Sequence, residues 1–171
     1  MKQTEIIANE IAEGLCEFMP TVVEFGEDTV VGVPNDINNN DLVIYVKENE
    51  LVLTFGYQNA HFAPQDIKDC ILHARKYLTS EYASVEFFYK EKDLFGGSRY
   101  ADTVNFDTVE GIVNCYSAGN EKAAQGLYEF LKNNSGVTVR AVTFDNSLND
   151  VVEVKYNGKD FILNRMPDKN N

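Results

Sequence analysis

The chain has 171 residues, of which 44% are hydrophobic, and a formal net charge of −12 at pH 7. This length is typical of one domain, and the hydrophobic fraction can build a core, which excludes global disorder. Residues 1–50 hold eleven Asp and Glu residues against two Lys residues, a net charge of −9, whereas the remainder carries −3. Such a surface repels nucleic acid and anionic membranes, so charge favours a basic protein as partner.

The composition along the chain favours the bacterial cytoplasm. The first segment is interrupted by acidic residues and lacks the apolar core of a secretory signal. No apolar run approaches the roughly 18 residues of a membrane span. The cysteines have no regular spacing, which is typical of reduced, buried thiols in a reducing compartment; they are Cys16, Cys70 and Cys115.

Apolar residues at helical spacing predict three helices. They cover residues 4–18, 67–78 and 120–131; Pro20 ends the first, Pro64 suits the first turn of the second, and Asn120 caps the third. Runs rich in β-branched and aromatic residues predict strands. These runs are 22–25, 30–33, 42–46, 51–55, 85–90, 108–116, 137–144, 151–156 and 159–163.

Turn signals join several of these strands into hairpins. Gly26-Glu27-Asp28 and Asn157-Gly158 are hairpin turns, and Gly96-Gly97-Ser98 is predicted as a turn leading into another strand. The alternation within residues 42–46 is compatible with a strand covered on both faces. We therefore predict an α+β fold, mostly antiparallel, with about three helices packed on the sheet, in a single domain of residues 1–171 with a weak subdivision near 117.

Two patterns were tested for metal binding. Asp36-x-Asn38-x-Asn40 begins like a calcium loop, but Asp41 and Lys47 stand where that loop needs Gly and a bidentate Glu. Cys70 and His73 lie three residues apart on a helix, but Cys70 belongs to the apolar stripe and no second ligand pair has matching spacing. The sequence predicts no metal site.

Catalytic signatures were sought in the same way. The chain has two histidines, no G-x-S-x-G motif, and no catalytic signature around any cysteine. Gly96-Gly97-Ser98 lacks the Lys-Ser/Thr ending of a P-loop and a following helix. We therefore predict no catalytic residue and no cofactor, which favours binding over catalysis without deciding whether the protein is an enzyme.

Six carboxylates in the acidic first segment are the candidate partner-binding residues. They are Glu10, Glu13, Glu17, Glu24, Glu27 and Asp28. The first three share one side of the first helix, where like charges repel and no Lys or Arg intervenes. One interpretation is a solvated helix face. The other, which leads here, is an acidic interaction module that steers a basic protein toward itself.

The segment from Tyr57 to Phe62 offers an alternative site. It is predicted as a loop between a strand and a helix, rich in side chains able to bind a ligand. A small-ligand-binding protein or an enzyme would then have a pocket lined by Tyr57, Asn59, His61, Arg99 and Tyr100. In the structural interpretation, His61 bonds to backbone and Phe62 packs under the loop.

Residues 42–62, LVIYVKENELVLTFGYQNAHF, resemble a hairpin of small uncharacterised bacterial proteins. In those proteins the second strand runs into an aromatic–His-x-His-Phe element before a helix, and some are similar to immunity proteins of bacterial toxin systems. The resemblance covers about residues 42–100 and includes Gly96-Gly97-Ser98. Gln58 and Asn59 replace the aromatic residue and the first histidine, so a role needing two histidines is not carried over. The resemblance implies an immunity-like protein that occludes a basic toxin.

Overall fold

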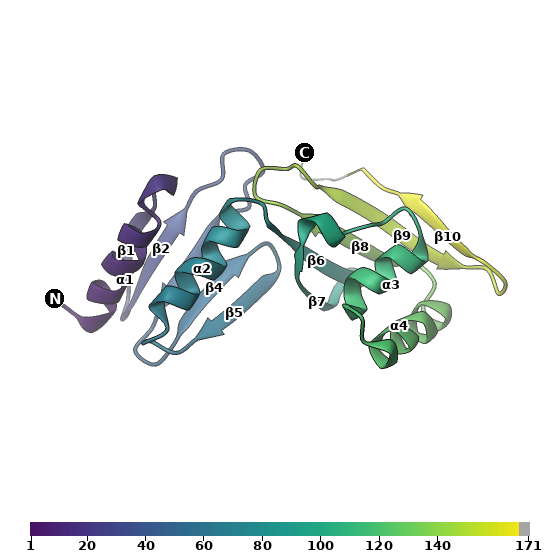
Figure 1. Ribbon diagram of the computed structural model, residues 1–171, viewed down its shortest axis with the longest axis horizontal. Coiled ribbons are helices and arrows are strands. Elements are labelled where there is room, and N and C mark those ends of the chain that lie inside the picture. Colours follow the sequence, from purple (N-terminus) through teal and green to yellow (C-terminus); the bar gives the residue numbers. More distant parts are fainter. Residues whose placement is uncertain (168–171) are drawn as a thin grey trace. The chain divides into compact units, whose positions relative to one another are not determined.

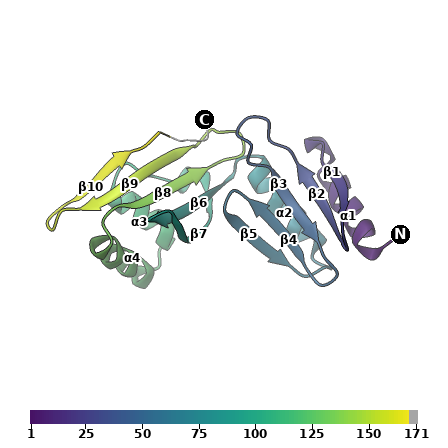
Figure 2. The same cartoon turned by 180° about the vertical axis from the view of Figure 1, so that it is seen from behind.

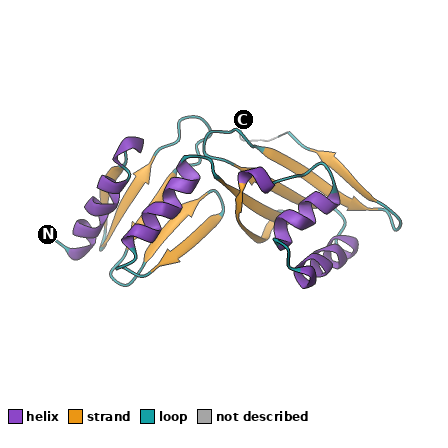
Figure 3. Ribbon diagram, in the orientation of Figure 1, coloured by secondary structure: helices purple, strands orange, loops and turns teal. Residues whose placement is uncertain are grey.

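The computed structural model describes residues 1–167, which form an α+β fold with two antiparallel five-stranded sheets (Figures 1 and 3). The predicted fold class is confirmed. The chain expected as a single domain divides into two compact units, Met1–Glu81 and a second that begins at Tyr82. Residue 117 ends a helix inside the second unit, so the subdivision expected there does not coincide with the boundary between the units.

The first unit contains two α-helices, one short 3₁₀ helix and a sheet in the order β1-β2-β3-β4-β5. The helices are α1 (Gln3–Gly14), the 3₁₀ helix (Cys16–Phe18) and α2 (Ile67–Leu78). The strands are β1 (Thr21–Phe25), β2 (Asp28–Val33), β3 (Leu42–Val46), β4 (Leu51–Phe55) and β5 (Gln58–Phe62). Each strand pairs with the next along the chain; residues 34–41 form the loop between β2 and β3, and short turns make the other three connections.

Both helices of the first unit cover the same face of its sheet, and Figure 2 shows the strands from the opposite side. Strand β3 illustrates the alternation that results. Leu42, Ile44 and Val46 are fully buried beneath the helices, whereas Tyr45 is 37% exposed on the other face. The expectation that this strand is covered on both faces is therefore wrong for Tyr45.

Residues 58–62 form strand β5 and not the predicted loop. Gly56 has a φ of 58°, and with Tyr57 it makes a two-residue turn, so that Phe55 pairs with Gln58. Two-residue hairpin turns need such positive φ values, which glycine adopts without strain. The polar composition of the segment hid a strand because an edge strand can be polar on its exposed side.

The second unit has a sheet in the order β10-β9-β8-β6-β7 with two α-helices on one face. Its strands are β6 (Tyr82–Tyr89), β7 (Lys92–Tyr100), β8 (Val137–Val142), β9 (Asp150–Tyr156) and β10 (Phe161–Arg165). Its helices are α3 (Val109–Ser117), α4 (Glu121–Asn133) and a short 3₁₀ helix (Ala101–Thr103). Their inner faces and the sheet form one core that includes Phe87, Ile112 and Leu131.

The predicted strand at 108–116 is in fact helix α3. The Thr108 side chain caps it by accepting a hydrogen bond from the backbone N–H of Gly111 at 3.0 Å. Ile112, Val113 and Cys115 are then buried at helical spacing. The segment's β-branched residues suggested a strand, but packing against the sheet overrides this weak local preference. The described residues thus hold four α-helices where about three were expected.

Gly96-Gly97-Ser98 lies within strand β7, so the turn predicted there is also wrong. The hairpin instead turns at Lys90 and Glu91, whose φ values are 50° and 64°. The prediction failed because glycine here serves close strand packing, not a turn. Among residues 1–167, no helix is long and apolar enough to cross a membrane.

Candidate functional site

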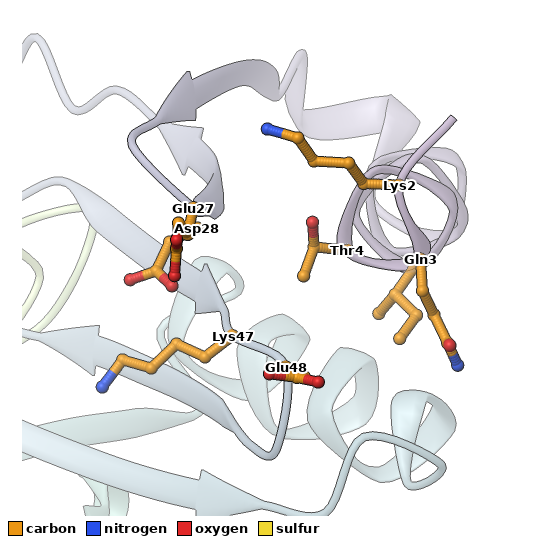
Figure 4. Close-up of a pocket in the computed structure, with 8 residues that line it drawn as sticks. Lys2, Gln3, Thr4, Glu27, Asp28, Lys47 and Glu48 are labelled. Carbon is orange, nitrogen blue, oxygen red and sulfur yellow. The ribbon is translucent and has the colours of Figure 1, made fainter.

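The N-terminal turn of α1 lies next to two hairpin turns at one end of the first sheet, and an open cleft of about 290 Å³ lies between them (Figure 4). The buried Thr29 hydroxyl donates a hydrogen bond to the Thr4 hydroxyl at 3.1 Å, which joins the start of β2 to the start of α1. The lining residues are Lys2, Gln3, Thr4, Ile7, Glu27, Asp28, Lys47 and Glu48.

The cleft is negative even though two lysines line it. Lys47 Nζ lies 3.0 Å from Glu50, and Lys2 Nζ lies 3.7 Å from Glu24; neither acid lines the cleft. The hydrogen bond that Lys47 donates to Glu50 is the main reason that the pKa of Lys47 is raised, with a smaller contribution from the negative charge of Asp28. Each lysine therefore has an acid of its own. The three lining carboxylates, Glu27, Asp28 and Glu48, exceed what the lysines can neutralise.

The six predicted acids divide into two groups. Arg75 of α2 holds Glu17 in a two-pronged ion pair, with distances of 3.0 and 2.8 Å, and also donates to the carbonyl of Gly14. Glu24 has Lys2 as its partner. Asp28 lies within electrostatic reach of Lys47. Of the six, Glu10, Glu13, Glu27 and Asp28 form no ion pair within residues 1–167.

Glu10 and Glu13 are exposed on the outer face of α1, opposite the buried Ile7 and Ile11. They line a shallow depression together with Ile6, which is 53% exposed. The structure therefore separates the acids into an outer helix face and a cleft that holds Glu27 and Asp28. Only Glu17 is turned toward α2.

Glu48 also lines the cleft, although its position in the sequence did not predict this. It lies in the turn between β3 and β4, and only the pairing of β2 with β3 places it near Asp28. No local signal distinguishes it from any other acidic turn residue. Its neighbour Glu50 was missed for the same reason; hydrogen bonds from His61 and Lys47 lower the pKa of Glu50.

The five residues predicted for the alternative pocket are divided between the two units. Tyr57 lies at the β4–β5 turn, and Asn59 and His61 are exposed on one side of β5 in the first unit. His61 Nδ1 lies 2.9 Å from a carboxylate oxygen of Glu50, so the expectation that His61 bonds to backbone is wrong. The remaining two pocket residues, Arg99 and Tyr100, belong to β7 of the second unit.

Arg99 has a structural partner within its own unit. Its Nε donates to the carbonyl of Cys115 and its Nη2 to that of Tyr116, both at 2.7 Å. These carbonyls lie in the last turn of α3, where helix carbonyls lack internal partners. Arg99 therefore fastens the end of α3 to strand β7.

Replacing Arg99 with methionine is expected to lower the free energy of unfolding by about 1–2 kcal/mol, because two helix-end carbonyls lose charged donors. Urea unfolding measures the change, and Lys92→Met, at an exposed position of the same strand, serves as control. If both variants unfold like the wild type, the fastening role of Arg99 is wrong.

Within residues 1–167, no group of three or more His, Cys, Asp or Glu side chains is placed to hold a metal ion.

No protein-family model matches the chain, and no curated protein or solved structure is significantly similar to it. The resemblance to immunity-like proteins therefore stays a prediction, and functional conclusions depend on the site itself.

Proposed function

We propose that this protein is an interaction module whose acidic first unit binds a basic protein, and that occlusion of a basic toxin, as in immunity proteins, is the form of this binding. The observation that carries the proposal is the set of carboxylates without a cationic partner around α1 and the cleft. Glu10, Glu13 and Glu27 are all exposed and have no ion pair within residues 1–167.

The unpaired carboxylates are better suited to attracting a partner than to stabilising the fold. Exposed ion pairs contribute about 0–1 kcal/mol, so the chain gains little by arranging its own acids. Uncompensated acids beside each other do raise the encounter rate with a positively charged partner, by about tenfold or more at low salt. Most of the chain's negative charge lies in residues 1–50, so this field is concentrated on the first unit.

The test begins with affinity capture from cells that carry the gene, followed by purification of each captured protein. We expect a basic protein that is retained at low salt and released at high salt. The triple variant Glu10→Gln/Glu13→Gln/Glu27→Gln is then expected to slow its association by about tenfold at low salt, measured by stopped-flow or surface plasmon resonance.

A matched control removes the same amount of charge from the second unit. Glu91→Gln/Asp102→Asn/Asp160→Asn changes three exposed acids there. Both triple variants are compared at about 0.1 M salt, where the field of an exposed charge fades over about 10 Å. The control is expected to leave the association rate there within about twofold. Equal slowing by both triple variants, or binding that is insensitive to salt, contradicts the proposal.

A further inference from the structure

Strand β1 is an edge strand whose five residues are all exposed. It pairs with β2 on one side and with no strand of its sheet on the other. Three of its residues are apolar: Val22, Val23 and Phe25 are 39, 58 and 74% exposed. The β1–β2 pairing has no register shift, so the free edge is regular over its whole length.

The other three edge strands in residues 1–167 differ from β1 in composition, regularity or exposure. Strand β5 is mainly polar, and β7 begins with Lys92 and Asp93 and has a register shift against β6. Like β1, strand β10 has one charged residue and no register shift, but its Arg165 forms ion pairs with Asp107 and Asp150, and three of its five residues are exposed, compared with all five of β1. Proteins usually blunt exposed edges with charges, prolines or bulges, because unpaired N–H and C=O groups recruit further strands. Strand β1 has a single charge, Glu24, and no bulge.

We infer that the free edge of β1 receives an extended segment of the partner as a sixth strand of the first sheet. This inference rests on the proposed function and specifies how binding occurs. An added strand satisfies the unpaired backbone groups of β1 and covers its apolar side chains, as in other cases of strand addition.

The side chains on the two faces of β1 determine which partner segment fits beside it. Val23 and Phe25 lie on the face without helices, whereas Val22 and Glu24 lie on the helix side, since Val22 pairs with the buried Val31. The incoming strand therefore places apolar residues beside Val23 and Phe25 and a basic residue beside Glu24, where it competes with Lys2 for this exposed carboxylate. Beyond Phe25, the cleft offers Glu27 to a basic residue that extends past the end of the strand.

A second copy of this chain fits the same edge poorly. Each copy would bring its own Glu24 and Glu27 and a first segment of net charge −9 to the contact. The long-range repulsion between two such units opposes pairing. Charge complementarity thus selects a segment in which lysine or arginine alternates with apolar residues.

The probe is a peptide of about seven residues that alternates lysine and valine, five to pair with β1 and the others to reach the cleft. Tryptophan replaces its central valine. The chain contains no tryptophan, so fluorescence excited where tyrosine does not absorb comes from the peptide alone. We expect the alternating peptide to bind saturably. A control peptide of the same composition has its lysines and valines in two separate blocks. It is expected to bind at least about tenfold more weakly, because neither of its faces is then uniformly basic or apolar.

Backbone methylation of the peptide separates strand addition from simple charge attraction. Alternate residues of a strand direct their N–H groups to opposite sides, so only one set faces β1. Methylating that set is expected to weaken binding by about tenfold or more, whereas methylating the other set leaves it within about twofold. If both methylated peptides bind like the parent, or if the parent does not bind, strand addition is wrong. The proposed function is then still decided by the capture experiment and its charge variants.

Variants of the protein locate the binding edge. Val23→Thr/Phe25→Thr removes apolar contact from exposed positions and places a β-branched residue, which favours strands, at each. It is expected to weaken peptide binding by about tenfold, whereas the control Ile162→Thr, on edge strand β10, is not. Equal effects of the two variants overturn the assignment to β1. The assignment is also overturned if the wild-type chain alone forms a dimer and Val23→Thr/Phe25→Thr converts it to a monomer. In that case β1 would bind a second copy of this chain.

Discussion

Replacing Glu86 with glutamine is expected to stabilise the second unit at alkaline pH and to remove most of its pH dependence between pH 5 and pH 9. Glu86 lies in β6, an interior strand of the second sheet between β8 and β7, and is 3% exposed. Burial is the main reason that its pKa is raised to about 8, and the hydrogen bond to Asp93 and the negative charge of Asp93 add to it. Arg140 lies opposite Glu86 in the register of strands β6 and β8, yet the pKa of Glu86 remains high.

The direction of the pH effect on stability depends on whether the folded or the unfolded state binds the Glu86 proton more tightly. The folded protein keeps Glu86 protonated up to about pH 8, whereas the unfolded chain releases this proton near the ordinary value of 4.5. Between these values the folded state binds more protons, so the free energy of unfolding falls as pH rises. One pKa unit corresponds to about 1.4 kcal/mol, so the full loss is of the order of a few kcal/mol.

Glutamine keeps the shape and the hydrogen-bond donor of the protonated acid without an ionisable group. We therefore expect Glu86→Gln to be about 2–4 kcal/mol more stable than the wild type at pH 9, and to differ by less than about 1 kcal/mol at pH 5. Urea unfolding at several pH values measures this, and hydrogen exchange of the β6 amides assigns it to the second unit.

The control for this prediction is Glu91→Gln, an exposed acid in the turn that follows β6. It should leave the pH dependence of the wild type intact. Wild-type stability that stays flat from pH 5 to pH 9 would falsify the assignment of a protonated Glu86.

Replacing Gly96 with alanine is expected to lower the free energy of unfolding by about 2–4 kcal/mol, since overpacked strands must shift their backbone. A Cβ atom at Gly96 would lie 2.4 Å from the carbonyl oxygen of Val85 and 2.5 Å from the carboxyl group of Glu86. The first of these is backbone and cannot rotate away. Gly96 is therefore fixed by close approach between β6 and β7.

Gly126→Ala provides the matched control with the opposite sign. Gly126 lies inside α4, and a Cβ atom there meets nothing within 4 Å. Alanine is expected to stabilise the protein by about 0.5–1 kcal/mol, because it restricts the unfolded chain and favours helix. Thermal or urea unfolding of both variants tests the pair; equal effects at the two sites contradict the packing argument.

Local patterns in the sequence predicted much of the fold. The apolar spacing of residues 67–78 gave α2 with its bounds, and Asn120 caps α4 as expected, since its side chain accepts a bond from Ala123. The β1–β2 and β9–β10 hairpins also follow from their turn residues. These predictions succeeded because periodicity, capping and turn chemistry involve neighbours in sequence.

The sequence by itself also determined the excess of acid in residues 1–50. Only the tertiary structure decided which acids keep their charge unpaired. Arg75 neutralises Glu17 from a helix far along the chain, and strand pairing brings Glu48 into the cleft. Likewise, α3 became a helix and β5 an edge strand through packing and pairing with distant segments. Such contacts depend on how distant segments approach one another, which local spacing does not encode.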